Sequence, residues 1–307
     1  MISSGTAPFY SVNRYYRELF GEKVYKLSLD GGMTCPNRDG KLDTRGCIFC
    51  SEGGSGDFSA RASLPIHDRI TEAISYVAPK YKGDKYIAYF QAYTNTYAPV
   101  EYLRNLFTET CLDPRIAGIS IATRPDCLED DKISLLRELN RIKPVWVELG
   151  LQTIKESSAE YIRRGYPLSV FEDTYERLTK AGIPAIIHVI IGLPGESYKD
   201  NIACAGFLAK KHVHGVKLQL LHVLQNTDLA VDYEKGLFRA LSMDDYINRI
   251  IGMIENLPPE TVIYRITGDG PRNSLIAPLW SLNKKNVLNS ITKEFARRNT
   301  YQGKEYL

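Results

Sequence analysis

The sequence is poor in histidine, tryptophan and methionine, and it contains no long hydrophobic run. Its 307 residues include 5 His, 2 Trp and 4 Met. No stretch approaches the roughly 18 consecutive apolar residues that a membrane-spanning helix requires. Segment 1–23 also lacks the apolar core of a signal peptide. We therefore predict no membrane association and a cytoplasmic location.

Neither sign of charge is in large excess. Lys and Arg total 39 against 36 Asp and Glu, a formal net charge of +3, so a nucleic-acid-binding surface would require local clustering of basic residues. Hydrophobic residues make up 44% and charged residues 24% of the chain, which is typical of a folded globular protein. Because the cytoplasm is reducing, the six cysteines are not expected to form structural disulfides. Their spacing therefore indicates some other chemistry.

Short apolar or β-branched segments alternate with longer segments of helical periodicity from residue 23 onward. One helix separates each predicted strand from the next, which is typical of parallel β-α units. Six such units predict an α/β fold, a partial (β/α)6 TIM-like barrel that the apolar segment 261–266 can extend. The predicted strands are 24–29, 85–90, 117–121, 145–149, 184–191 and 215–221, and the predicted helices lie near 66–79, 99–111, 130–142, 168–181 and 198–212.

Polar and glycine-rich segments follow these predicted strands. Right-handed crossovers place the carboxyl ends of the strands, and the loops after them, on one face of a barrel. The loops include DGGMTCPNRDG, QAYTNTYAP, ATRPD, GLPGE and TGDGPR, so we predict a functional site on that face. We divide the chain into an N-terminal extension at 1–22, a barrel core at 23–270 and a C-terminal helical extension at 271–307.

Three cysteines are grouped directly after the first predicted strand. Cys35, Cys47 and Cys50 have the spacing Cys-x11-Cys-x2-Cys, and their thiolates can face one metal centre. A structural zinc site normally has a fourth ligand; His67 is the nearest candidate, but no second Cys-x2-Cys or His pair completes the set. An iron–sulfur cluster held by three cysteines leaves one iron open for a substrate or cofactor, and we favour this interpretation. The other cysteines are predicted to be buried: Cys111, Cys127 and Cys204.

With these motifs the sequence resembles the radical S-adenosylmethionine (radical SAM) superfamily. Its members carry a three-cysteine loop after the first barrel strand, with an aromatic residue before the last cysteine, here Phe49 in CIFC. The spacing differs from the common CxxxCxxC form and matches a longer-loop branch related to the Elongator catalytic subunit. The motifs SLDGGMTCPNRDG, FQAYTNTYAP, IATRPDCL, VELGLQT and IIGLPGE are similar to the YtqA/YhcC family, and the likeness covers residues 10–280.

The resemblance implies a radical SAM barrel with two cofactors. Cys35, Cys47 and Cys50 would hold a [4Fe-4S] cluster, and its open iron would bind the amino and carboxylate groups of S-adenosylmethionine (SAM). Reduction by an external donor such as flavodoxin or ferredoxin would cleave SAM to methionine and a 5′-deoxyadenosyl radical, which takes a hydrogen atom from the substrate. These three cysteines are therefore the predicted catalytic and metal-binding residues.

The resemblance also places SAM-binding residues after successive strands. Where the family has a glycine-rich turn for the SAM ammonium, this chain offers Gln91, Thr94 or Asn95. Arg164 matches the arginine that pairs with the SAM carboxylate, and its neighbour Arg163 remains an alternative. The other predicted SAM-binding residues are Phe49, Glu148, Gln152, Ile190, Gly192 and Gly195.

Two of these assignments have structural alternatives. Glu148 and Gln152 match positions that address the ribose and methionyl portions, whereas Glu148 is otherwise a polar residue of the barrel interior. We favour contact with SAM, because an unpaired carboxylate there would be costly. Gly192 and Gly195 would let the backbone approach the adenine, or they would serve an ordinary strand-to-helix turn.

The substrate is less clearly indicated. Basic and aromatic residues are mixed at 13–17 and 293–306, a composition that suits phosphate contacts and base stacking or a solvated helix face. Resemblance to Elongator-type enzymes implies tRNA as partner, with conversion of carboxymethylaminomethyl-uridine to aminomethyl-uridine at the wobble position. The alternatives are radical SAM chemistry on a small metabolite or protein side chain, and a zinc-stabilised nucleic-acid-binding module. The residues expected to face the substrate are Gln219, His222, Gln225, Asn226, Arg265, Asp269 and Arg272.

Overall fold

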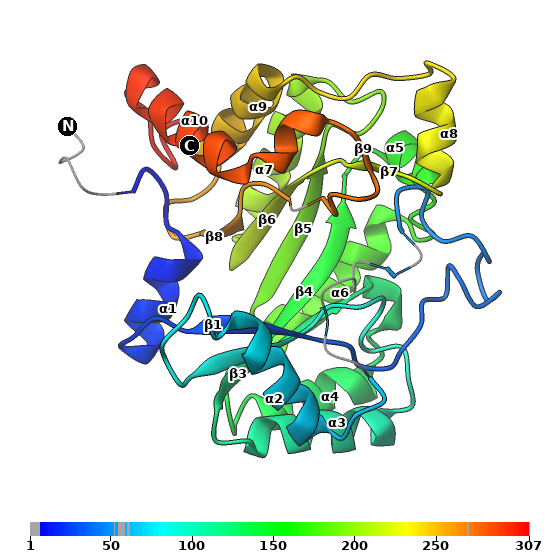
Figure 1. Cartoon of the computed structure of the whole chain (residues 1–307), viewed down its shortest axis with the longest axis vertical. Helices are drawn as coiled ribbons and strands as arrows, with labels where there is room; N and C mark the ends of the chain where they lie inside the picture. The colour runs from blue at the N-terminus through cyan, green and yellow to red at the C-terminus, as the bar shows by residue number, and fades with distance from the viewer. Residues whose placement is uncertain (1–6, 52, 55–58, 60–61, 269, 307) are drawn as a thin grey trace.

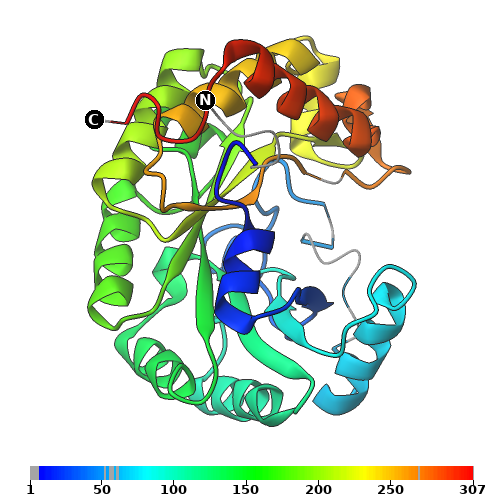
Figure 2. The ribbon, with the colours of Figure 1, turned by 90° about the vertical axis from the view of Figure 1, so that its left-hand side faces the viewer.

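A seven-stranded parallel sheet forms the centre of the computed structural model, which describes residues 7–51, 53–54, 59, 62–268 and 270–306. The strand order is β1-β2-β3-β4-β5-β6-β8, so β1 and β8 are the two edges. The sheet curls into an open barrel with helices on its outside (Figure 1, Figure 2). The strands are β1 (Tyr25–Leu29), β2 (Tyr86–Phe90), β3 (Ile116–Thr123), β4 (Val145–Gln152), β5 (Ala185–Ile191), β6 (Gly215–Leu220), β8 (Val262–Arg265) and, in a separate antiparallel pair, β7 (Val223–Leu224) and β9 (Leu275–Ala277).

The outer helices bury the apolar side of the sheet. Successive strand residues face opposite sides, and Leu27, Ile119, Val147, Ile187 and Leu218 lie on the outer side in the main hydrophobic core. Removing these side chains from water is a major source of stability for a sheet covered by helices. The helices are α1 (Val12–Phe20), α2 (Ile66–Val77), α3 (Val100–Leu112), α4 (Asp130–Leu139), α5 (Glu156–Tyr161), α6 (Leu168–Lys180), α7 (Tyr198–Lys210), α8 (Asp228–Glu234), α9 (Met243–Glu255) and α10 (Lys284–Arg298), with short 3-10 turns η1 (Pro125–Cys127) and η2 (Leu279–Leu282).

Helix α1 packs against the amino ends of the strands. Its Tyr16 is 3% exposed and lies with its ring centroid 5.7 Å from that of Trp146. Arg14 of the same helix pairs with Glu18, with 2.7 Å between Nε and Oε1. The prediction that the aromatic residues of 13–17 stack on RNA bases is therefore wrong for Tyr16, because a base cannot reach a buried ring.

The predicted strands agree with the observed sheet. The apolar segment 261–266 adds β8 beside β6. Helix α9, between β7 and β8, was not among the predicted helices; it packs against α7 and α10. Helix α10 buries Val287, Ile291 and Phe295 in the same core as the barrel. Within the described ranges, the helices are too short or too polar to cross a membrane.

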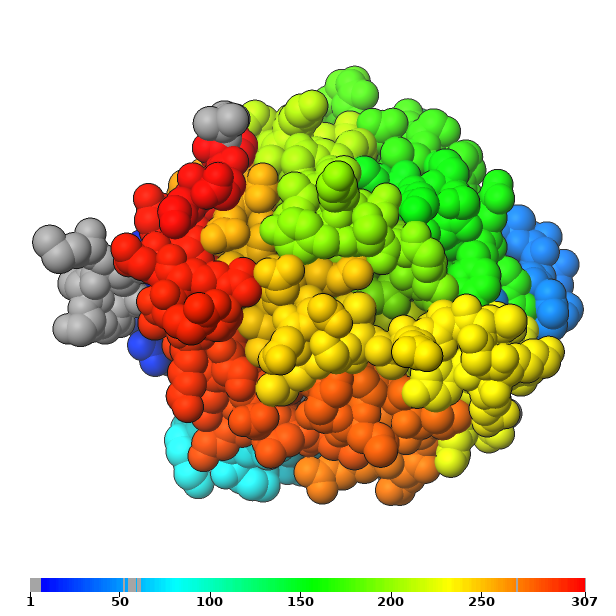
Figure 3. Space-filling view, turned by 90° about the horizontal axis from the view of Figure 1, so that it is seen from above, coloured from blue at the N-terminus to red at the C-terminus, as the bar shows by residue number. Residues whose placement is uncertain are grey.

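Segments that follow β6 cover the carboxyl ends of the strands. Helix α8 (yellow) and the connection around β9 and η2 (orange) lie next to each other on this face, and α10 (red) borders it (Figure 3). Because parallel strands end here, this is also the face at which the predicted site loops converge.

Candidate active site

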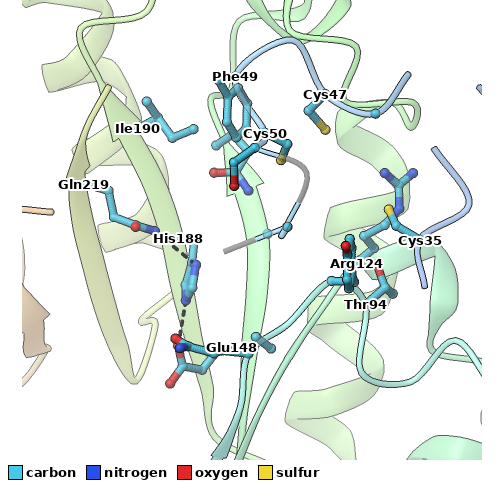
Figure 4. Close-up of a pocket in the computed structure, with 18 of the residues that line it drawn as sticks. Cys35, Cys47, Phe49, Cys50, Thr94, Arg124, Glu148, His188, Ile190 and Gln219 are labelled. Carbon is cyan, nitrogen blue, oxygen red and sulfur yellow. Dashed lines mark hydrogen bonds and ion pairs between the residues drawn. The ribbon is translucent and has the colours of Figure 1, made fainter. Parts of the chain in front are cut away.

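A cavity of about 460 Å³ opens at the carboxyl ends of the strands. It has the size and position of a small-molecule site in a β/α barrel. Side chains from the loop after β1 form one wall, and polar side chains of β4, β5 and β6 form its floor (Figure 4). The predicted site residues that line it are Cys35, Cys47, Phe49, Cys50, Gln91, Thr94, Glu148, Gln152, Arg164 and Ile190.

The three predicted ligand cysteines lie along one wall of this cavity (Figure 4). Arg38 holds their loop by donating to the carbonyls of Cys50 and Ser51, at 3.2 and 2.6 Å. Gly46 has φ +78°, and a Cβ on it would lie 2.9 Å from Arg38 Nε. Glycine is therefore required at this turn, because any side chain would displace the arginine that fixes the loop.

The Cys47 thiol lies among groups that favour its negative form. A hydrogen bond from Cys50 lowers the pKa of Cys47 to about 6, and the positive charges of Arg124 and Arg163 act in the same direction. The Asn37 amide also donates to Cys47 Sγ at 3.4 Å. The same sulfur contact, with burial, raises the pKa of Cys50. Three thiols beside guanidinium groups fit an anionic iron–sulfur cluster.

The geometry does not fit the zinc alternative. His67, the suggested fourth ligand, lies on α2 with Nδ1 3.3 Å from Asp113 Oδ2, and Arg115 also contacts its ring. In the described part of the chain, no three His, Cys, Asp or Glu side chains converge as ligands of a single ion. Thiolates that bind different irons of one cluster are more widely spaced than ligands of one ion. The remaining cysteines are buried, as predicted: Cys111, Cys127 and Cys204.

The guanidinium of Arg164 makes its hydrogen bonds to other groups of the protein. Its guanidinium is 2% exposed and donates to the carbonyls of Leu151 and Thr153 through Nη1, at 3.1 and 2.7 Å. Nε donates to the carbonyl of Tyr166 at 2.9 Å, and Nη2 contacts Glu156 at 3.1 Å. This network ties the end of β4 to α5, so the geometry gives Arg164 a structural role and does not support the predicted contact with the SAM carboxylate.

Arg124, which the sequence analysis did not single out, lies in the cavity wall near Cys35 (Figure 4). It follows β3 in the ATRPD motif, and its Nε and Nη2 donate to the two oxygens of Asp126 at 2.9 and 2.8 Å. Among the described residues, its Nη1 has no acceptor. The guanidinium also lies 4.9 Å from the ring centroid of Tyr166. A guanidinium fixed on two sides is preorganised to bind a carboxylate.

Arg163 is not among the residues that line the cavity. Its Nη2 bonds Asp228 Oδ2 at 2.5 Å, while its backbone carbonyl accepts from Asn37 Nδ2 at 2.7 Å. The residue has φ +55°, a conformation that non-glycine residues rarely adopt. Arg163 therefore holds the cysteine loop through its backbone.

Three predicted SAM-binding residues are not in the cavity wall. Asn95 is fully buried and its amide donates to the carbonyls of Ala92 and Ala122, at 2.9 and 3.1 Å. Gly192 and Gly195 have φ of +97° and +78°, so the strand-to-helix turn itself requires glycine. Their predicted contact with SAM is thus without support in this geometry.

The predicted substrate residues divide in a similar way. Gln219, His222 and Arg265 line the cavity, and Asp269 lies outside the described residues. The others are not among the residues that form its wall: Gln225, Asn226 and Arg272.

The cavity floor is an ionic cluster centred on Glu148, which is 1% exposed. Its Oε1 accepts from Lys26 Nζ at 2.5 Å and from Ser120 Oγ at 2.6 Å. Its Oε2 accepts from His188 Nε2 at 2.7 Å and pairs with Lys217. Both oxygens are therefore used within the protein, which favours the barrel-interior alternative for Glu148 over direct contact with SAM.

Protonation in this floor follows from its burial. Burial alone would raise the pKa of Glu148, but Lys217 and Lys26 hold it well below its usual range. Burial lowers the pKa of His188 to about 4, so its Nε2 carries a proton toward Glu148 and its Nδ1 accepts from Gln219 at 3.2 Å. Burial likewise lowers the pKa of Lys217 to about 7. The sequence signal for this cluster is a single charged or histidine residue inside the otherwise uncharged strand segments of β1, β4, β5 and β6.

Comparison with known proteins agrees with the barrel and the cysteine loop. Residues 44–208 match the Radical SAM superfamily, and residues 213–297 match the Radical_SAM C-terminal domain. The chain is 45% identical to the uncharacterized protein YtqA of Bacillus subtilis over 96% of this chain and 92% of that one. It is 34% identical to the protein YhcC of Escherichia coli over 86% and 85%.

More distant similarity extends to Elongator proteins. Elongator complex protein 3 of Schizosaccharomyces pombe is 26% identical over 52% of this chain and 29% of its own length. The solved structure of archaeal Methanocaldococcus infernus Elp3 superposes with a TM-score of 0.67 at 17% identity, over 91% of this chain and 64% of that one. This structural likeness shows a shared fold.

Proposed function

Since this chain belongs to the radical SAM superfamily, we propose that it is an enzyme that modifies the wobble uridine of tRNA. Its cofactors are a [4Fe-4S] cluster and SAM. When bound, they supply one-electron chemistry that removes a hydrogen atom from a carbon of the substrate. The proposed conversion is that of carboxymethylaminomethyl-uridine to aminomethyl-uridine: the bond between the nitrogen and the carboxymethyl carbon would break, the two-carbon unit would leave as glyoxylate with its aldehyde oxygen from water, and SAM would take up the two electrons as it is cleaved to methionine and 5′-deoxyadenosine.

The observation that carries the tRNA proposal is the sequence similarity to Elongator complex protein 3, the resemblance that implies the wobble uridine as substrate. The basic segment 293–306 adds less support than its composition suggested. Arg297 and Arg298 both donate to Glu294 at 2.7 Å, so much of their charge is balanced. The cavity at the open end of the barrel, of about 460 Å³, has the size of a small-molecule or cofactor site.

Different residues of the cavity wall hold the two cofactors in this proposal. Cys35, Cys47 and Cys50 hold the cluster, and the Asn37 amide near Cys47 supports the thiolate charge. Arg124 binds the SAM carboxylate through its remaining nitrogen, Nη1. The other wall residues that contact SAM in this proposal are Phe49, Gln91, Thr94, Gln152 and Ile190. An external electron donor such as flavodoxin or ferredoxin completes the system.

Arg124→Lys is expected to weaken SAM binding by about tenfold, because an ammonium cannot keep the Asp126 pair and a carboxylate contact in one plane. Calorimetric titration of SAM into the anaerobically reconstituted protein measures the effect. Arg163→Lys is the control, because Arg163 is not among the residues that line the cavity and its guanidinium bonds Asp228. Equal SAM affinity in Arg124→Lys and the parent protein would remove Arg124 from the SAM site.

Transfer RNA is expected to stimulate SAM cleavage. We would measure 5′-deoxyadenosine released by the reduced, reconstituted protein with and without tRNA that carries 5-carboxymethylaminomethyl-uridine. The stimulation should fall as salt increases, because phosphate contacts release counterions. If release is the same without tRNA, or if a peptide or metabolite extract stimulates it and tRNA does not, the alternative substrate class is correct.

A further inference from the structure

Strand β8 contains a one-residue register shift that brings Arg265 into the cavity. Val216 of β6 pairs with Ile263, but the next residue, Lys217, pairs with Arg265. Tyr264 is therefore the extra residue of a bulge. In an unshifted register Tyr264 would stand opposite Lys217. Bulges of this kind re-aim side chains and are frequent beside active sites.

The bulge places a second cation directly opposite a buried one. Lys217 is 4% exposed, and Arg265 beside it lines the cavity. The positive charge of Arg265 contributes to lowering the pKa of Lys217 and of Lys26. Like charges at directly opposed strand positions destabilise a sheet, so this arrangement is unfavourable in the free protein.

The floor holds more positive than negative charge. Lys26 and Lys217 occupy the two oxygens of Glu148, and no other carboxylate is among the described cavity residues. His188 is neutral at pH 7 because burial lowers its pKa to about 4. Among the described residues, Arg265 has neither a hydrogen-bond acceptor nor an ion-pair partner. An anionic ligand would supply the missing partner.

We propose that the guanidinium of Arg265, next to Lys217, binds a carboxylate of the substrate at the cavity floor. A planar guanidinium matches the two oxygens of a carboxylate. A carboxylate would also offset the positive charge that Lys26, Lys217 and Arg265 hold in excess of Glu148. This proposal rests on the proposed function in one respect. The carboxylate that we assign to Arg265 is the one in the carboxymethyl group of the modified uridine.

The test compares two nucleosides that differ in the carboxymethyl group, 5-carboxymethylaminomethyluridine and 5-aminomethyluridine. Calorimetric titration into the reconstituted, SAM-saturated protein is expected to show at least about tenfold preference for the first. Arg265→Gln should abolish the preference, whereas Arg272→Gln, which changes an exposed arginine outside the cavity lining, should keep it. Preference retained by Arg265→Gln would overturn the proposal.

Thermal unfolding of the same variants separates binding from folding. Because Arg265 lies beside other cations and has no ion-pair partner among the described residues, Arg265→Gln should leave the unfolding midpoint unchanged or raise it. A lowered midpoint would mean that Arg265 stabilises the empty protein, contrary to the proposal.

Simple anions distinguish failure of this inference from failure of the proposed function. Succinate is expected to stabilise the parent protein against heat more than inorganic phosphate does, and Arg265→Gln should lose this effect. If succinate binds in this way but tRNA is never modified, the anion site stands and the proposed function fails. If tRNA is modified equally well by Arg265→Gln, the function stands and the anion site fails. Stronger, Arg265-dependent stabilisation by phosphate would overturn the carboxylate assignment.

Discussion

Alanine in place of Cys35, Cys47 or Cys50 is expected to abolish both cluster absorbance and SAM cleavage. The physical reason is the count of ligands: each substitution removes one of three thiolates that hold the cluster in this account. Their loop is fixed by protein contacts, notably those of Arg38 to the carbonyls of Cys50 and Ser51. We therefore expect each variant to fold while it loses iron, measured by iron and sulfide analysis after anaerobic reconstitution.

The matched control replaces the three buried cysteines together with alanine: Cys111, Cys127 and Cys204. Burial raises the pKa of each of these thiols, so they are poor thiolate ligands. This triple variant should retain its cluster. Loss of iron from the folded triple variant, together with retention in Cys47→Ala, would show that the ligands are assigned to the wrong cysteines.

Glu148→Gln is expected to destabilise the fold by roughly 3–5 kcal/mol, because it leaves the charges of Lys26 and Lys217 buried without a counter-ion. Glutamine has nearly the same size as glutamate, so the expected loss of stability does not come from lost packing. Denaturant unfolding at pH 7 measures the loss. Glu176→Gln is the control, since that carboxylate forms an exposed helical pair with Lys180, and such pairs contribute little.

The stability difference between Glu148→Gln and the parent should depend on pH in a defined direction. The two lysines hold the pKa of Glu148 well below its usual range in the folded protein. Its contribution is therefore complete above the ordinary glutamate pKa of about 4.3 and is lost as the pH falls through the lowered value. The two unfolding curves should approach each other on acidification. A difference that stays constant from pH 7 to pH 3 would contradict the ion-pair explanation.

The alternating strands and helices of the barrel could be predicted from the sequence, because apolar residues recur with different periods in strands and in helices. The cysteine spacing was equally readable, since it lies in one local loop. Arg265 was expected to face the substrate and does line the cavity, but it does so through a one-residue register shift of β8, and no residue pattern marks that shift. A one-residue slip turns a side chain to the other face of a sheet.

The roles of the individual arginines could not be predicted from the local sequence either. Arg164 and Arg124 both lie in polar loops. Only the folded structure shows that the Arg164 guanidinium donates its hydrogen bonds to the carbonyls of Leu151 and Thr153. The tyrosines of segment 13–17 suggested RNA stacking by composition. Tyr16 instead packs on Trp146, a contact between residues far apart in the sequence.

The most direct test of the central claim is the nucleoside composition of tRNA after reaction. Transfer RNA that carries 5-carboxymethylaminomethyl-uridine would be incubated anaerobically with the reconstituted protein, SAM and a reductant, digested, and analysed by mass spectrometry. We expect this nucleoside to decrease and 5-aminomethyluridine to appear in equal amount, and we expect neither change with Cys47→Ala. An unchanged nucleoside profile, under conditions in which the same protein cleaves SAM, would contradict the account.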